Sequence, residues 1–321
     1  SDTGMQDIKK SVLENITEKN IGGSYIKRSG IVEEEIKNAF KIISSEGIQP
    51  LTVVVDAGNA MAALYIEPLF KKLPCKLIKM NFKLDGTFPS HQPDPLIFDN
   101  FKDLYKRVVS EKADLGIAPD GDGDRIFFVD EKGKMIPASM ITALIAKELL
   151  ALYPKEHFLC DIRYMMTPKS IIEENGGTYG ITKVGHSFIT KQLQDENGIF
   201  GGESSGHMLY RATGGAESQI ASILIVLKAL SESGLSLSDI IEKNRRSYES
   251  GEYNFKTDAS EKILKELKKK YSDADLSLLD GVSIQYSDWR CNVRTSNTEP
   301  LLRLNVEAKN QEIMTTKLQE I

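Results

Sequence analysis

Residues 118–125 are Ala118-Pro119-Asp120-Gly121-Asp122-Gly123-Asp124-Arg125, with three aspartates at alternate positions and glycine between them. Apolar runs at 113–118 and 126–130 flank this stretch, and each run is typical of a β-strand. Because glycine allows sharp bends, we expect the carboxylates to converge in a tight loop between the strands. Converging carboxylates repel one another unless a cation neutralises them, and their oxygens suit hard cations. The stretch therefore predicts a divalent-metal site, with Mg²⁺ or Ca²⁺ as its ion.

Two other interpretations of this loop are open. An EF-hand beginning at Asp120 would have Glu131 at its twelfth position, but its sixth position is Arg125, where that turn needs glycine. The flanking runs are also typical of strands rather than helices. A solvated acidic turn is the simpler alternative, although turn chemistry alone does not require three alternating aspartates followed by arginine.

Strands and helices alternate on both sides of the loop. The apolar run 51–56 leads through a glycine turn into a helix over 61–72, and a second strand follows at 76–81. A helix over 95–109 then precedes the strand that ends at the aspartate loop. The pattern indicates βαβ units, and it places the loop at a strand end, where open α/β sheets bind ligands.

The rest of the chain is divided by a change of pattern. Residues 137–247 repeat the alternation, with helices predicted at 138–151, 168–174, 187–196 and 216–232 and strands at 158–162, 178–182 and 199–202. Residues 233–251 are interpreted as a helix and linker. The last part has a helix at 259–270, strands at 282–286, 289–293 and 301–307, and a helix from 310. The predicted fold class is α/β, with two consecutive α/β domains of mixed sheets (11–136 and 137–247) and a smaller α+β C-terminal domain (248–321).

Composition restricts the possible functions. The 321 residues carry 41 basic and 46 acidic side chains, a net charge of −5, which gives no indication of nucleic-acid binding. No apolar run approaches a membrane span, and the N-terminal residues lack a secretory signal. The three cysteines have neither metal nor redox spacing. We therefore expect a cytoplasmic protein without nucleic-acid or membrane partners.

Two further polar loops have the composition of ligand-binding sites. Residues 294–300 include Arg294, Ser296, Asn297 and Thr298, which is a suitable set for holding a phosphate, although a simple turn would use the same residue types. Residues 201–207 include Glu203, Ser205 and His207 between glycines. These groups can exchange hydrogen bonds with sugar hydroxyls, and a glycine-rich turn is the alternative.

Three more candidates follow predicted strands. Lys183 is placed to bind phosphate or to transfer a proton. His186, close to it, is more often structural than catalytic when considered alone. Arg163 can reach a cleft at the strand ends, but a surface arginine is the simpler interpretation.

The order of these motifs is informative even though each is ambiguous. Asp-Gly-Thr-Phe-Pro-x-His at residues 85–91, the aspartate loop, Gly-Gly-Glu-x-Ser-Gly-His at 201–207 and Arg-Thr-Ser-Asn-Thr-Glu-Pro at 294–300 follow one another along the chain. This series resembles the α-D-phosphohexomutase superfamily, and most closely its phosphomannomutase/phosphoglucomutase branch. The resemblance extends from about residue 5 to the end.

The resemblance implies a role for each candidate. Asp120, Asp122 and Asp124 would bind Mg²⁺, and Glu203 and Ser205 would bind sugar hydroxyls. Arg294, Ser296, Asn297 and Thr298 would hold the substrate's phosphate. Lys183 matches a position near the general acid/base, while the remaining matches line the cleft: Arg125, Arg163, His186 and His207. The implied ligands are glucose or mannose 1- and 6-phosphates.

One family motif is absent from this sequence. The loop Thr-x-Ser-His-Asn-Pro carries the serine that is phosphorylated and donates its phosphoryl group, and no such loop occurs here. The resemblance therefore implies family domains two to four, with residues 1–10 as a linker or helix from a missing first domain. We expect the chain alone to bind Mg²⁺ and sugar phosphates but to be inactive as a mutase. The rival hypotheses are a natural non-catalytic sugar-phosphate binder and a Mg²⁺-dependent phosphatase with Asp120 as nucleophile.

Overall fold

The structure is a computed structural model that describes residues 4–15, 22–296 and 300–321. It divides into a short N-terminal unit, Ser1–Ile31, and a large unit, Val32–Ile321. In the first unit, helix α1 spans Met5–Leu13. Everything below concerns the large unit, with helix α2 (Ile31–Ile42) at its start.

The first sheet contains the aspartate loop. Its strand order is β2-β1-β3-β4, with β1 parallel to β2 and β3, and β3 antiparallel to β4. The bounds are β1 Thr52–Asp56, β2 Lys76–Met80, β3 Leu115–Pro119 and β4 Ile126–Val129, with helices α3 Ala63–Phe70 and α4 Lys102–Ser110 and the 3₁₀ helix η1 Phe98–Phe101. Asp120–Arg125 joins the antiparallel pair β3–β4, as the flanking apolar runs predict.

The second sheet repeats this plan with one more strand. The order is β6-β5-β7-β8-β9, parallel on the β6-β5-β7 side and antiparallel on the other. The bounds are β5 His157–Asp161, β6 Thr178–Thr182, β7 Phe200–Gly202, β8 Met208–Tyr210 and β9 Ala216–Glu217, with helices α5 Ala138–Leu152, α6 Met166–Glu174, α7 His186–Asp195, α8 Gln219–Ser233 and α9 Leu237–Asn244 and the 3₁₀ helix η2 Arg211–Thr213. The predicted helix over 216–232 therefore starts three residues late, because residues 216–217 pair with β8.

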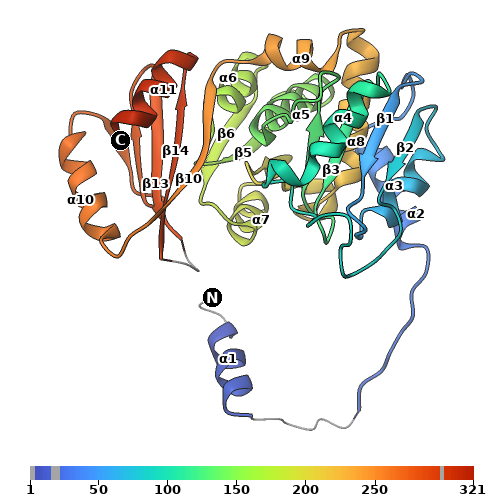
Figure 1. Cartoon of the computed structure of the whole chain (residues 1–321), viewed down its shortest axis with the longest axis horizontal. Coiled ribbons are helices and arrows are strands. Elements are labelled where there is room, and N and C mark those ends of the chain that lie inside the picture. The colour runs from blue at the N-terminus through green and yellow to red at the C-terminus, as the bar shows by residue number, and fades with distance from the viewer. Residues whose placement is uncertain (1–3, 16–21, 297–299) are drawn as a thin grey trace. The chain divides into compact units, whose positions relative to one another are not determined.

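One continuous apolar core joins these two sheets. Helices α5 and α8 lie within it, in contact with each other, and α8 also contacts α3 (Figure 1). Each has eleven buried residues spread around its circumference, because its sequence is apolar on nearly every side. A helix without a polar face must be covered all round, which is why these two occupy the interior.

The third sheet is antiparallel and has a core of its own. Its order is β10-β14-β13-β12-β11. The bounds are β10 Tyr248–Lys256, β11 Asp275–Ser277, β12 Val282–Gln285, β13 Trp289–Thr295 and β14 Leu301–Ala308, with helices α10 Ser260–Lys270 and α11 Gln311–Glu320. The interpretation of residues 248–251 as linker is wrong, since they begin strand β10. The three sheets together confirm the predicted fold class.

Two buried charged residues connect the third sheet to the second. Arg290 donates hydrogen bonds from Nη1 and Nη2 to the carbonyl oxygens of Arg163 (2.8 Å) and Ile162 (2.7 Å). Glu307 accepts from the backbone N–H groups of Met165 (3.0 Å) and Met166 (2.9 Å). Both side chains are almost fully buried, so this junction fixes the segment that follows β5, including Arg163.

No single helix in the described ranges has the length and apolar run of a membrane span. Helices α8 and α9 pass that test only as a pair, by length and composition, and they are bent by 93° at the break between them.

The Glu307 carboxylate provides a stability test of the junction. In Glu307→Gln an amide N–H₂ replaces one acceptor oxygen, so a buried backbone N–H loses its partner. We expect the free energy of unfolding to fall by about 2–4 kcal/mol. Urea unfolding followed by the fluorescence of Trp289, the single tryptophan, would measure it. Glu312→Gln on the exposed face of α11 is the control, with a change within about 0.5 kcal/mol. Equal unfolding curves for the two variants would contradict the assignment.

Candidate functional site

The aspartate loop is organised around Asp120, whose side chain is 1% exposed. Its Oδ1 accepts hydrogen bonds from the backbone N–H groups of Gly123 and Arg125, both at 3.1 Å. Its Oδ2 accepts from Arg125 Nε at 2.6 Å. Gly123 has φ +82°, and a Cβ there would lie 3.2 Å from the Tyr65 ring, so the turn favours glycine for both conformation and space.

The three carboxylates do converge as predicted. One oxygen from each of Asp120, Asp122 and Asp124 lies within 4.8 Å of the other two. Burial raises the pKa of Asp120 to about 6, whereas a hydrogen bond from His207 lowers the pKa of Asp124. Carboxylate oxygens are hard ligands, and three of them at this spacing suit a divalent cation such as Mg²⁺. The helical flanks of an EF-hand are absent from this described segment, since β3 and β4 border the loop.

The β7–β8 loop lies directly against the aspartate loop. Ile126 N–H donates to the carbonyl of Gly206 at 3.1 Å, and Arg125 and His207 form an antiparallel bridge. Gly206 has φ +96°, and a Cβ there would lie 2.6 Å from the Phe127 ring. The close approach of these two loops therefore requires glycine at this position.

His207 connects the charges of the two loops. Its Nε2 lies 3.5 Å from Asp124 Oδ1, and its Nδ1 lies 3.0 Å from Glu203 Oε2. Burial opposes the charged imidazolium, but the hydrogen bonds and charges of both carboxylates outweigh it and raise the pKa of His207 to about 9. His207 is therefore an imidazolium at neutral pH.

Glu203 and Ser205 are engaged inside the protein. Glu203 is 1% exposed, and its Oε1 accepts from the backbone N–H of Gly185 at 2.8 Å. Ser205 Oγ lies 3.3 Å from Glu203 Oε2 and 3.4 Å from Arg163 Nη2. A sugar hydroxyl would have to replace or extend these contacts, so binding of hydroxyls by Glu203 and Ser205 stays a prediction.

Arg163 is buried rather than a surface residue. Its guanidinium makes a two-point contact with Asp161, with Nη2 at 2.8 Å from Oδ2, and Asp161 also accepts from the Ser204 N–H at 2.6 Å. Asp161 ends β5, which explains why Arg163 is held at the edge of the sheet beside the β7–β8 loop. The sequence prediction did not include Asp161. The signal that could have identified it is a carboxylate at the end of a strand, two residues before an arginine.

Two arginines of the third sheet, Arg294 in β13 and Arg303 in β14, add positive charge near Arg163. Arg294 lies in β13 rather than in the loop predicted for it, and its Nη2 contacts Glu252 at 2.7 Å. Burial and the positive charge of Arg163 lower the pKa of Arg294. Arg303 also contacts Glu252, at 3.6 Å, and donates to Ser296 Oγ at 3.4 Å. Arg303 was missed because its segment was assigned only as a strand, and Glu252 because residues 252–258 were assigned to no element. Asn297 and Thr298 lie outside the described residues.

Lys183 and His186 are less tightly held. Lys183 Nζ lies 5.5 Å from the centre of the Phe188 ring, and it forms no ion pair with the described residues. His186 is half-exposed, with Nε2 2.9 Å from Glu217 Oε1 and its ring centre 5.8 Å from that of His207. The sequence prediction missed Glu217, because a helix was expected at its position.

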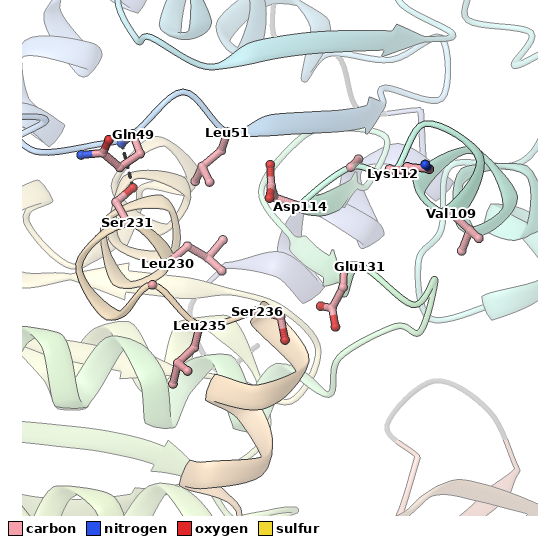
Figure 2. A pocket seen from close by; sticks show the side chains of 12 residues that line it. Gln49, Leu51, Val109, Lys112, Asp114, Glu131, Leu230, Ser231, Leu235 and Ser236 are labelled. Atoms are coloured by element: carbon pink, nitrogen blue, oxygen red, sulfur yellow. Dashed lines mark hydrogen bonds between the residues drawn. The ribbon is translucent and has the colours of Figure 1, made fainter.

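A cavity of about 530 Å³ lies elsewhere in the fold and is a weaker candidate (Figure 2). It borders Leu51 and Asp114, at the starts of β1 and β3, whereas the aspartate loop follows the end of β3. Asp114 accepts from the Thr52 N–H at 2.7 Å, and Glu131 accepts from the Ser238 N–H at 3.1 Å. The carboxylates of this cavity therefore already accept hydrogen bonds from backbone N–H groups. For this reason we assign ligand binding to the other end of the sheet, at the aspartate loop.

Known proteins resemble the chain over most of its length. Profiles of the phosphoglucomutase/phosphomannomutase family match alpha/beta/alpha domain II over residues 33–133, alpha/beta/alpha domain III over 137–248 and the C-terminal domain over 252–321. Phosphohexose mutases from Xanthomonas campestris are 36% identical over 290 residues, 89% of this chain and 65% of that protein. A Vibrio cholerae phosphomannomutase is 34% identical across 100% of this chain and 71% of its own length.

A solved structure agrees with the family matches. A phosphoglucomutase/phosphomannomutase family protein from Burkholderia thailandensis superimposes with a TM-score of 0.87 at 26% identity, covering 98% of this chain and 68% of that one. The chain thus spans about 65% of the length of the Xanthomonas relatives.

The raised pKa of His207 gives a pH test. We expect its imidazole to titrate near pH 9 in NMR spectra of the folded chain, above the ordinary 6.5. Because the folded state holds this proton more tightly, the stability it contributes is fully present below pH 6.5 and is lost as the pH rises through about 9. Glu203→Gln removes one acceptor and should lower the pKa of His207. Glu33→Gln on α2, outside the site, should leave it unchanged. A titration near 6.5 in the unaltered chain would refute the charge arrangement.

Proposed function

This chain belongs to the phosphoglucomutase/phosphomannomutase family, and we propose that it provides the metal, sugar and phosphate sites of an enzyme that interconverts hexose 1-phosphates and 6-phosphates. Glucose and mannose phosphates are the proposed substrates. The observation that carries the proposal is the continuous path from Asp120–Asp124 through His207 and Ser205 to Arg163. This path brings together three kinds of proposed ligand group: carboxylates for a hard cation, polar groups for sugar hydroxyls, and a guanidinium for phosphate.

The proposed phosphate-binding part of the site consists of three arginines: Arg163, Arg294 and Arg303. Guanidinium groups bind phosphate through two parallel hydrogen bonds. The lowered pKa of Arg294 reflects positive charge gathered in a buried place, and an added anion would relieve that repulsion. Ser296, which contacts Arg303, is proposed as an additional donor, together with Asn297 and Thr298.

The proposed metal is Mg²⁺, held by Asp120, Asp122 and Asp124. When bound, it would supply positive charge to offset the charge of a phosphoryl group. Arg125 already neutralises part of Asp120 and would face the same group. Lys183 and His186 are proposed to move protons to and from sugar hydroxyls, and His207 is proposed to hold Glu203 and Asp124 in place.

The reaction needs a phosphoryl donor. In the proposed sequence a phosphoserine P–O bond breaks as a sugar hydroxyl oxygen bonds to the phosphorus and loses its proton. The bisphosphorylated sugar then reorients in the cleft, and its other phosphoryl group is transferred back to the serine. This sequence has no Thr-x-Ser-His-Asn-Pro loop, so we propose that the chain alone binds substrate without turnover.

The phosphatase alternative is disfavoured by the surroundings of Asp120. A nucleophilic carboxylate needs a free oxygen facing its substrate. Asp120 is 1% exposed, and both of its oxygens accept hydrogen bonds from Gly123 or Arg125. The carboxylate is therefore suited to hold the loop and a cation rather than to attack phosphorus.

Binding of sugar phosphate by the chain is the test of this proposal. Isothermal titration should detect glucose 6-phosphate or mannose 6-phosphate, but not the unphosphorylated sugars. Arg294→Met should weaken binding by about tenfold to a hundredfold, since a hydrogen bond to a charged group contributes roughly 1.5–3 kcal/mol. Arg107→Met on α4, which removes a surface arginine paired with Glu111, should have no effect.

The assay must separate binding from catalysis. A coupled assay on both 1-phosphates should give no turnover by the chain alone. Equal affinity for sugar and sugar phosphate would overturn the proposed site. Turnover with intact binding would overturn only the proposal that the phosphoryl donor lies outside this sequence.

A further inference from the structure

A second group of metal-ligand side chains lies beside the aspartate loop. Asp124, His207 and Glu217 each place one ligand atom within 4.8 Å of the other two. They come from three separate parts of the chain: the β3–β4 loop, the residue before β8, and strand β9. Side chains from such distant segments converge only because the second sheet packs its β8–β9 edge against the loop.

His186 lies next to this group and contacts Glu217, although it is not one of the three residues whose ligand atoms lie within 4.8 Å of one another. It is the first residue of α7, and its Nε2 lies 2.9 Å from Glu217 Oε1. On the other side of the group, His207 Nε2 lies 3.5 Å from Asp124 Oδ1. The two imidazole rings are 5.8 Å apart between centres. Because His186 is half-exposed, its ring can adjust by a small rotation without disturbing the core.

Two of these separations are close to those between neighbouring ligands of a tetrahedral transition-metal ion. Zn²⁺ binds imidazole nitrogen at about 2.0–2.1 Å and carboxylate oxygen at about 2.0–2.2 Å. Tetrahedral geometry then places neighbouring ligand atoms roughly 3.3–3.5 Å apart, and the contacts of 2.9 and 3.5 Å lie close to that spacing. We propose that Asp124, His207 and Glu217, joined by His186 after a rotation of its side chain, form a binding site for Zn²⁺ or a similar transition-metal ion. His207 releases its ring proton to solvent when the ion binds, so binding strengthens as the pH rises.

The ligand types distinguish this site from the aspartate loop. Imidazole suits zinc, copper, nickel and cobalt ions, whereas Mg²⁺ prefers oxygen ligands alone. The buried Oε1 of Glu217 contacts His186 Nε2 at 2.9 Å, but this ion pair lacks hydrogen-bond geometry, and no other described residue donates a hydrogen bond to the oxygen. A carboxylate oxygen without such a bond can bind a metal ion without first losing a hydrogen bond.

Asp124 belongs to both groups, so the two kinds of cation would compete. A transition-metal ion bound between Asp124 and His207 would withdraw this carboxylate from the other two aspartates. Binding itself does not depend on the proposed mutase function. The consequence, antagonism between Zn²⁺ and Mg²⁺, rests on the proposed role of the aspartate loop.

Ordinary ion pairing is the alternative explanation of these contacts. Another histidine–glutamate pair, between His157 of β5 and Glu196 at the end of α7, has Nε2 and Oε2 2.7 Å apart. No further metal-ligand group joins it among the described residues. Glu196→Gln therefore removes the same kind of contact as Glu217→Gln and serves as the matched control.

Cobalt is the most direct probe, because tetrahedral Co²⁺ absorbs visible light far more strongly than octahedral Co²⁺. Titration of the untagged chain with Co²⁺ should give saturable visible bands at one ion per chain, which Zn²⁺ then abolishes. Glu217→Gln should weaken binding by more than tenfold, since even loss of an outer-shell partner costs about 10–100-fold in affinity. Glu196→Gln should bind Co²⁺ as the unaltered chain does.

A second variant separates the loss of a metal ligand from a loss of folding stability. His186→Ala lies at an exposed helix start and should leave the unfolding curve unchanged while weakening Co²⁺ binding by a similar factor. Weak octahedral absorption would overturn the proposal, as would equal affinity in Glu217→Gln and Glu196→Gln. Saturable binding that responds to Asp122→Asn and not to Glu217→Gln would assign the ion to the aspartate loop and would also overturn it.

Discussion

The ion pair between Asp120 and Arg125 is the contact on which the site depends. Three aspartates within five residues repel one another, and one of them, Asp120, is buried. Arg125 offsets the buried charge, while two backbone N–H groups bond to the same carboxylate and close the turn. These hydrogen bonds hold the loop in this conformation without a bound cation, which reduces the ordering that binding would otherwise require.

The second constraint is the close approach of the β3–β4 and β7–β8 loops. Gly206 allows backbone pairing across them, and His207 contributes an imidazolium between Asp124 and Glu203. Arg163 is fixed from the other side by Asp161 and by the buried Arg290–Glu307 junction with the third sheet. Contacts within each loop and contacts between loops and sheets thus both support the proposed ligand groups, as in a preorganised site.

The sequence predicted those features that depend on local pattern. Alternating Asp and Gly between apolar runs is sufficient for the hairpin loop, and βαβ periodicity is sufficient for the two mixed sheets. Strand β10 was missed because residues 248–256 contain Gly251 and many polar side chains, and only pairing with the distant β14 makes them a strand. Glu217 and Glu252 were missed for a similar reason: each matters through a partner that the fold, and not the local sequence, places beside it. Asp161 was missed although its partner Arg163 is only two residues away in the sequence.

The central claim is that the converging aspartates form a hard-cation site. Anomalous scattering from a crystal of the chain soaked with Mn²⁺, which accepts the same oxygen ligands as Mg²⁺, tests it most directly. We predict one peak between the carboxylates of Asp120, Asp122 and Asp124, and loss of that peak in Asp122→Asn. Aspartates that keep their contacts with Arg125 and His207 and show no peak at saturating Mn²⁺ would contradict the claim.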